Sequence, residues 1–417
     1  MIRDVRSNRA VAVPNAGRAA CPHAAAPWPK VRLRDISLGI YDGPHATPPP
    51  CEISDKYYLG IPHVTPKGLI DLSSPRYISD EDFPKWTRRV TPQAGDLIFS
   101  YEATLNLYAI IPKGLTCCLG RRMGLIRIDP NQVDGRYLYY YFFSDEWRNL
   151  IASKTIIGAT VDRLPILTFP DFEVSLPPLP IQRRIASVLG AYDDLIENNR
   201  RRIALLEKMA RELYRERFVR RAGKGNTVTL GEIATITMGQ SPDSSGYNSE
   251  GRGLPFHQGA TGFGNRFPKN EMWSTSGKRF AEAGDILFSV RAPVGRINIA
   301  TEKIIMGRGV ASLRQKEGLQ NWFYYALKDY FSQEDMIGVG CVFASTTKDE
   351  LHAVKMQMPP VSEISVFERL IRPIDDDLWN LTEQNRSLSR QRDRLLPRLM
   401  SGKIDVEALV KEEERHG

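Results

Sequence analysis

The chain has 417 residues, of which 42% are hydrophobic and 25% charged, and this composition is typical of a globular protein. Its length exceeds what one ordinary hydrophobic core occupies, so we expect two or more domains. No apolar run approaches the ~18 residues of a membrane-spanning helix, and we expect a cytoplasmic protein with no membrane partner. The five cysteines and six histidines show no metal-ligand spacing, so we expect no metal site.

The net charge of +8 is unevenly distributed along the chain. Residues 1–226 contain 33 Lys and Arg against 24 Asp and Glu, whereas residues 227–417 contain 24 against 25. The excess of positive charge permits a polyanionic partner such as nucleic acid. If nucleic acid is the partner, the first half of the chain supplies more of the attraction to phosphates.

The N-terminal residues 1–30 are rich in Ala, Arg and Pro and lack the apolar segment of a secretory signal. We predict that they form a disordered N-terminal extension.

Residues 31–178 combine predicted strands with one aromatic helix. Short apolar runs such as DLIFS at 96–100 and LIRID at 125–129 are bounded by Gly and Pro, which is typical of strands. The stretch YLYYYFFSDEWRNLI at 137–151 has the character of a helix. Its aromatic side chains could stack on bases or fill the core. We favour the core, because the aromatics are contiguous and surrounded by apolar residues.

A long helix is predicted from residue 181 to 221, a stretch without proline. About 40 helical residues span ~60 Å at ~1.5 Å per residue. Apolar side chains recur at steps of three and four, which indicates a coiled-coil-like seam, and one polar residue on that seam is of the kind that fixes register. The seam positions are Ile185, Val188, Tyr192, Leu195, Asn199, Ile203, Leu206, Ala210 and Leu213.

The second half of the chain repeats the first in the same order. AGDLIFS at 94–100 returns as AGDILFS at 283–289, and VRLRDI at 31–36 matches VTLGEI at 228–233. GATVDRL at 158–164 matches STTKDEL at 345–351, and LPP at 176–178 matches MPP at 358–360. The offset between the copies falls in small steps, as expected when surface loops gain or lose residues. We infer an internal two-fold duplication. It ends in a second long helix over residues 363–400, whose apolar seam can be buried by antiparallel packing against the first helix.

This arrangement resembles the specificity (S) subunit of type I restriction–modification systems over residues 31–403. LPPLPIQRRIASVLGAYDDLIENNRRR and QNRSLSRQRDRLLPRLMSGKI are similar to the central and distal conserved regions of that family. GIPHVTPKGLIDL and GDILFSVRAPVG are similar to pieces of its target-recognition domains.

The resemblance implies a fold and a function. The fold class is α+β, with a pseudo-two-fold internal duplication and two mixed α/β target-recognition domains separated by two long antiparallel helices that form a coiled coil. Each domain would recognise one half of a bipartite site in double-stranded DNA, and the helices would set the spacer. Two methyltransferase (M) subunits would dock on the chain, and restriction/translocase (R) subunits would join them. S-adenosylmethionine, ATP and Mg belong to those partners, so no cofactor is expected in this chain.

The resemblance also divides the chain into six segments. They are a disordered extension (1–30), target-recognition domain 1 (31–178), the central conserved helix (179–222), target-recognition domain 2 (223–360), the distal conserved helix (361–403) and a C-terminal tail (404–417).

The chain lacks the motifs of the enzymes with which such a subunit works. The Pro-Pro pairs do not form the [DN]-P-P-[YFW] loop of an adenine methyltransferase, and no G-x-x-x-x-G-K-[ST] phosphate loop is present. No Ser/His/Asp or Cys/His constellation stands out. We therefore predict that the chain is not an enzyme on its own.

Arg and Lys recognise guanine, Asn and Gln recognise adenine, and basic side chains also contact phosphates. The predicted DNA-binding residues lie in Gly-rich or basic turns. In the first domain they are Lys56, His63, Lys67, Arg76, Lys85, Arg88, Arg89, Arg121 and Arg122. In the second they are Gln240, His257, Gln258, Asn265, Arg266, Lys278, Arg279, Arg291, Arg296 and Arg308.

Two alternatives stay open at the level of the sequence. The duplicated helices fit equally well a coiled-coil interaction scaffold that does not recognise DNA. The same sequence also fits a lone regulatory S subunit that redirects a methyltransferase encoded elsewhere.

Overall fold

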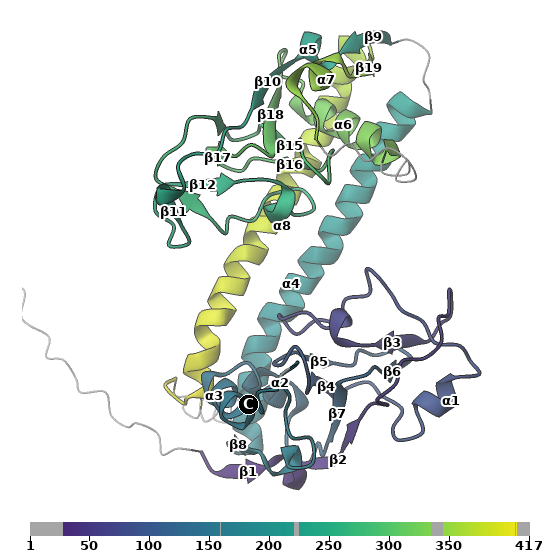
Figure 1. The fold of residues 1–417 in the computed structure, drawn as a ribbon, viewed down its shortest axis with the longest axis vertical. Helices are drawn as coiled ribbons and strands as arrows, with labels where there is room; N and C mark the ends of the chain where they lie inside the picture. Colours follow the sequence, from purple (N-terminus) through teal and green to yellow (C-terminus); the bar gives the residue numbers. More distant parts are fainter. Residues whose placement is uncertain (1–27, 159, 221–224, 335–344, 405, 407–417) are drawn as a thin grey trace, which may run out of the picture. The chain divides into compact units, whose positions relative to one another are not determined.

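The computed structural model describes residues 28–158, 160–220, 225–334, 345–404 and 406 (Figure 1). The chain forms two compact units. Unit 1 comprises residues 1–196 and 386–417, and unit 2 comprises residues 197–385. Most of the predicted extension at 1–30 and of the predicted tail at 404–417 lies outside the described residues.

The centre of unit 1 is a four-stranded antiparallel sheet. Its strand order is β2 (Ser37–Asp42), β7 (Met123–Ile128), β4 (Leu97–Ser100) and β5 (Tyr108–Ile110). All four residues of β4 are buried, because both faces of the sheet are covered. Leu97 and Phe99 pack into one hydrophobic cluster and Ile98 into another, as the alternation of side chains along a strand requires.

Two helices with aromatic side chains cover one face of this sheet. They are α2 (Gly135–Tyr141), whose N-terminus is capped by Asp134, and α3 (Asp145–Lys154), capped by Ser144. The side chains of Tyr137, Phe142 and Trp147 are 1% exposed or less, so the aromatic stretch forms core, as predicted, and presents no base-stacking platform.

Two strand pairs and a short helix also belong to unit 1. Strands β3 (Tyr57–Leu59) and β6 (Cys117–Leu119) form a parallel pair, and β1 (Lys30–Arg32) pairs with β8 (Glu173–Ser175). The short helix α1 (Phe83–Trp86) lies in the long connection between β3 and β4.

Unit 2 repeats this plan. Its central antiparallel sheet has the order β10 (Ala234–Met238), β18 (Val310–Gln315), β15 (Ile286–Ser289) and β16 (Ile297–Ile299). The elements around it are β9 (Asn226–Thr229) paired with β19 (Lys355–Met358), the helices α5 (Leu230–Ile233), α6 (Gln320–Glu334) and α7 (Lys348–Ala353), and a second sheet of β11 (Tyr247–Asn248), β13 (Trp273–Ser274), β12 (Leu254–His257), β17 (Ile304–Met306) and β14 (Phe280–Ala281).

The duplication extends to individual ion pairs beside the repeated AGDLIFS and AGDILFS phrases. In unit 1 the Asp96 carboxylate accepts hydrogen bonds from Arg127 Nε at 3.0 Å and Arg127 Nη2 at 2.7 Å. In unit 2 the Asp285 carboxylate lies 2.6 Å from Arg314 Nε. Each aspartate also caps its own turn, by accepting the backbone N–H of Gln93 or of Glu282.

Both predicted long helices are present. Helix α4 runs over Leu179–Tyr214, followed by a π-helical turn at Arg215–Val219, and α8 runs over Val361–Met400. In unit 1, Ile185 and Leu189 of α4 share a hydrophobic cluster with Leu399 and Met400 of α8.

In unit 2, Ala210 and Tyr214 of α4 share a cluster with Phe367 and Ile371 of α8. Asn199, predicted on the seam, is 1% exposed, and its Nδ2 donates to Gln384 Oε1 at 3.4 Å. Leu195 was predicted on the seam as well, but it is 46% exposed and Ile196 is buried instead. The buried stripe of α4 therefore passes one residue away from the predicted position.

The buried Asp96 carboxylate should contribute more to stability than an exposed carboxylate in a similar ion pair. Asp96→Asn removes the charge that two Arg127 nitrogens share, so we expect the free energy of unfolding to fall by about 1.5–3 kcal/mol. Asp285→Asn should cost less, because Arg314 is 53% exposed and Arg127 only 25%. Denaturant titration of the full chain measures both changes. The control is Asp55→Asn, whose side chain is 83% exposed, and an equal loss in this control would contradict the prediction.

Candidate nucleic-acid interface

Two turns of unit 2 line one hollow of about 490 Å³. The first turn follows β12 and contributes residues 258–261 and Phe263. The second turn follows β15 and contributes residues 291–293 and Arg296, and Gly309 completes the lining. Gln258, Arg291 and Arg296, which were predicted to bind DNA from separate parts of the sequence, thus lie around one hollow.

Close backbone contacts fix the first turn. The Gly307 N–H donates to His257 O at 2.8 Å, and the Gly309 N–H donates to Gln258 O at 2.9 Å. A Cβ atom at Gly309 would lie 2.6 Å from Gln258 O, so only glycine allows this approach. The Gly-Arg-Gly sequence at 307–309 therefore joins the end of β17 to the turn after β12.

The second turn is held by the buried Ser289 at the end of β15. Its hydroxyl donates to Pro293 O at 2.6 Å and accepts the Arg296 N–H at 2.8 Å. Gly295 adopts a φ of +86°, which a residue with a side chain rarely takes. These bonds engage the backbone of Pro293 and Arg296, and the side chains of Arg291 and Arg296 are exposed.

Three arginines lie at or beside the hollow. Arg291 and Arg296 line it, and Arg308 is exposed beside Gly309. Within the described part of the chain, none of these three guanidinium groups takes part in an ion pair. Three unpaired positive charges on short turns are suited to bind a polyanion.

The position of unit 1 that is equivalent to Arg291 carries the opposite charge. The Tyr101 N–H donates to Arg122 O, as the Val290 N–H donates to Gly309 O, so Arg122 occupies the place of Gly309. Glu102 likewise occupies the place of Arg291. Its carboxylate lies 3.0 Å from Arg122 Nε. Unit 1 thus has an internal ion pair at the place of Arg291, which has no ion pair among the described residues of unit 2.

Three predicted DNA-binding residues are buried and have other partners. His63 is 6% exposed, and its Nδ1 accepts the Gly60 N–H at 3.0 Å. His257 is 5% exposed, its Nε2 lies 3.0 Å from Asn270 Oδ1, and burial lowers its pKa. Arg266 is 5% exposed and pairs with Asp375 at 2.6 Å. Because these side chains hold turns from within the protein, we give them a structural role.

Other predicted residues of unit 1 lie at the surface but are partly engaged. Arg89 pairs with Asp42, and Lys56 pairs with Asp55 and Asp80. Two more cations lie over aromatic rings of the protein, Arg76 at 4.9 Å from the Tyr58 centroid and Lys85 at 5.0 Å from the Trp86 centroid.

The remaining predicted residues have exposed side chains. They are Lys67, Arg88, Arg121, Gln240, Asn265, Lys278 and Arg279. Lys67 lines a separate hollow of unit 1, together with Tyr139 and Tyr140.

Ser241 was missed by the sequence analysis. Its hydroxyl donates to Gln258 Oε1 at 2.9 Å and accepts the Arg308 N–H at 3.2 Å, so it links two predicted DNA-binding residues. Its sequence neighbour Gln240 was the only signal that pointed to this strand end.

The described residues contain no cluster of three or more potential metal ligands, and none of their helices is long and apolar enough to cross a membrane.

Comparison with known proteins identifies the family. The model of the type I restriction modification DNA specificity domain matches residues 58–208 and again residues 224–385. The chain therefore belongs to the family of type I restriction–modification DNA specificity subunits and contains two such domains. The role of this family is recognition of a DNA sequence, and its members are non-catalytic.

Similar proteins span almost the whole chain. A Methanocaldococcus jannaschii protein described as the specificity subunit of type I restriction enzyme MjaX is 29% identical, over 91% of this chain and 94% of that protein. The MjaIX specificity subunit of the same organism is 24% identical, over 92% and 94%. The crystal structure of a type I restriction–modification S subunit from M. genitalium has a TM-score of 0.57 at 17% identity, over 91% and 98% of the chains, and so shares the fold.

Proposed function

We propose that this chain recognises a bipartite DNA site, with each target-recognition domain binding one half. The observation that carries the proposal is the hollow of unit 2, where Gln258, Arg291 and Arg296 meet on rigid turns. Arg forms a bidentate pair with guanine, and Gln forms one with adenine. The turns therefore offer both kinds of base contact in one place, and Arg308 adds charge for phosphate contacts.

The proposed DNA-binding set omits the three buried residues. In unit 2 it comprises Gln240, Gln258, Asn265, Lys278, Arg279, Arg291, Arg296 and Arg308. In unit 1 it comprises Lys56, Lys67, Arg76, Lys85, Arg88, Arg89, Arg121 and Arg122. The basic residues of unit 1 are more often engaged with carboxylates or aromatic rings of the chain itself. We infer that its side chains approach DNA already oriented by these partners, which limits the freedom they lose on binding.

The two units should prefer different half-sites. Arg291 in unit 2 is free to bind a guanine edge or a phosphate. Its counterpart Glu102 in unit 1 carries the opposite charge and holds Arg122. Exchange of a cation for a carboxylate at one position changes which base edges are accepted, because a carboxylate accepts hydrogen bonds and repels phosphates.

We further propose that α4 and α8 form an antiparallel coiled coil that sets the spacer between the half-sites. Buried packing between the two helices within each unit supports this, as does the hydrogen bond from Asn199 to Gln384. The domain boundaries proposed from the sequence at 178, 222, 360 and 403 follow from this division. A rigid spacer makes both half-sites bind as one event.

The partners follow from the family. Specificity subunits work with methyltransferase (M) and restriction (R) subunits and with DNA. We propose that two M subunits dock on this chain, and that S-adenosylmethionine, ATP and Mg are bound by the partner subunits. A lone regulatory S subunit would share all of these features except the restriction partner.

Exchange of one domain tests the modular function. Replacing residues 228–355 by the equivalent segment of a relative should change one half of the methylated motif and leave the other half unchanged, because each unit has its own core. Methylation mapping of DNA from cells that express the hybrid with its methyltransferase measures the motif. A change in both halves would contradict modular recognition, and no bipartite motif at all would favour the coiled-coil scaffold.

Arg291 should contribute to specificity in the half-site of unit 2. Loss of one good bidentate base contact costs about 1–3 kcal/mol of discrimination. Arg291→Ala should therefore relax recognition at one position of that half-site by roughly tenfold. Selection from a random DNA library by the complex measures the change. Lys355→Ala, which also removes one exposed positive charge from unit 2, is the control. An equal loss in both variants would reduce Arg291 to a general electrostatic role.

The length of the helices should determine the spacer. Insertion of seven residues into α4, and of seven at the facing position of α8, adds two turns and keeps the seam in register. The added ~10.5 Å should lengthen the spacer by roughly three base pairs and preserve both half-sites. Arg201→Ala, at a position 75% exposed on α4, changes no length and is the control. An unchanged spacer in the longer protein would overturn this role of the helices.

A further inference from the structure

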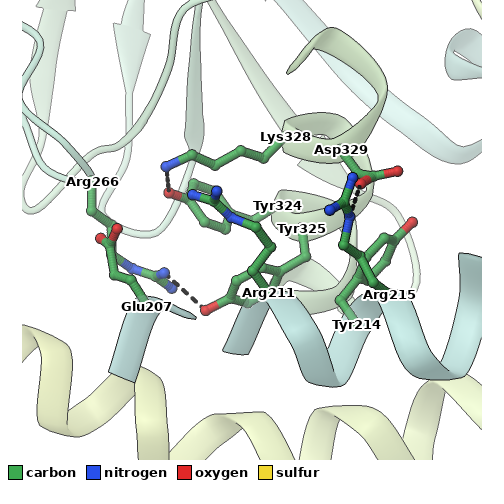
Figure 2. Close-up of a pocket in the computed structure, with 9 residues that line it drawn as sticks. All are labelled: Glu207, Arg211, Tyr214, Arg215, Arg266, Tyr324, Tyr325, Lys328 and Asp329. Atoms are coloured by element: carbon green, nitrogen blue, oxygen red, sulfur yellow. Dashed lines mark hydrogen bonds and ion pairs between the residues drawn. The ribbon is translucent and has the colours of Figure 1, made fainter. Parts of the chain in front are cut away.

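The turn that lines the hollow of unit 2 ends at a buried arginine. Arg266 Nη2 lies 2.6 Å from Asp375 Oδ1 of α8, and Arg266 Nη1 donates to Tyr325 Oη at 2.9 Å. The guanidinium also lies over the ring of Tyr324, 4.4 Å from its centroid. Figure 2 shows Arg266 beside both tyrosines of α6, with side chains of α4 on the near side.

Tyr325 completes this group, since its hydroxyl donates to Asp375 Oδ1 at 2.7 Å. Burial raises the pKa of Asp375, and the guanidinium of Arg266 opposes that rise. Each charge therefore depends on the other, because a buried ion that loses its partner is costly.

The backbone around Arg266 is bound to unit 2 as well. The Ile299 N–H of β16 donates to Arg266 O at 2.8 Å, and Asn298 Nδ2 donates to Gly264 O at 2.8 Å. The turn that lines the hollow is thus fixed at its end to β16 through the backbone and to α8 through one ion pair.

Unit 1 contains the same tyrosines and aspartate but a different cation. Tyr139 and Tyr140 of α2 correspond to Tyr324 and Tyr325, and Tyr140 Oη donates to Asp193 Oδ2 at 2.5 Å. Asp193 corresponds to Asp375, since both lie at the same place in their helices. Its cation, however, is Arg392 of α8.

The corresponding turn of unit 1 is residues 61–70. Tyr139 Oη donates to Gly68 O of this turn at 3.1 Å. Among the described residues, no side chain of the turn pairs with Asp193. The cation that pairs with this aspartate therefore comes from the second long helix in unit 1 and from the turn that lines the hollow in unit 2.

We propose that Arg266 is a positioning residue that ties the turn after β12 in unit 2 to helix α8 through Asp375. The corresponding turn of unit 1 has no such tie to its long-helix aspartate. The geometry of the hollow, and with it the position of Gln258, then depends on a carboxylate of the long helix in one domain only. The consequence for DNA rests on the proposed function, whereas the tie itself does not.

Hydrogen exchange of the full chain without DNA tests the tie. Asp375→Asn should raise amide exchange in residues 259–268 by about tenfold, because a hydrogen bond to a charged group is lost. The matched variant Asp193→Asn should leave exchange in residues 61–70 within twofold of the wild type. Equal responses of the two turns, or no response in unit 2, would overturn the proposal.

A milder matched pair covers the case in which Asp375→Asn fails to fold. Tyr325→Phe removes only the hydroxyl that joins Arg266 and Asp375, and Tyr140→Phe removes its counterpart in unit 1. We expect a severalfold increase in exchange for the turn of unit 2 and none for the turn of unit 1. Arg266→Lys keeps the charge but loses the bond to Tyr325, so its exchange should lie between wild type and Asp375→Asn. Amide exchange in Arg266→Lys as fast as in Asp375→Asn would contradict the role of the ion pair.

Selection from a random DNA library separates the tie from the proposed function. With the methyltransferase present, Asp375→Asn should relax only the half-site of unit 2. Faster exchange together with an unchanged motif would uphold the tie and refute DNA recognition by this turn. Unchanged exchange together with a relaxed motif would refute the tie and leave the proposed function standing.

Discussion

The structure of each unit depends on one strand that is buried on both faces. In β4, Leu97 and Phe99 point into the cluster with the aromatic helices, and Ile98 points into the cluster with β3 and β6. In β15, Ile286 and Phe288 make the same division, with Leu287 on the other side. A strand with no free face cannot bind DNA, which supports our proposal that the turns after it make the DNA contacts. The turn after β15 carries Arg291 and Arg296, and its shape is fixed by Ser289 at the strand end.

The duplication and the two long helices could be predicted from the sequence, because each depends on a pattern that extends over many residues. The duplication appears as a repeated order of short phrases, and the long helices appear as apolar spacing. The burial of the aromatic stretch follows from its contiguity. Such features are determined by the hydrophobic effect summed over many residues, so that one misplaced position such as Leu195 does not alter the result.

The roles of single polar residues could not be predicted in this way. Arg266 and Arg296 both lie in Gly-rich turns with similar neighbours, yet one is 5% exposed and the other lies on the surface. The difference is made by Asp375 and Tyr325, which are more than 50 residues further along the chain. Ser241 was missed for the same reason, because its partners Gln258 and Arg308 come from other turns.

The division between buried strands and exposed turns also supports our proposal that the two domains bind different half-sites. A change within β4 or β15 leaves a cavity or a clash in two clusters at once and costs stability. Glu102 and Arg291 occupy equivalent positions on turns outside these buried clusters, where substitutions cost little. The two copies can therefore diverge in charge at the turns while their sheets keep the same strand order. Arg266 combines both properties, because it belongs to a turn but its side chain is buried and paired with Asp375.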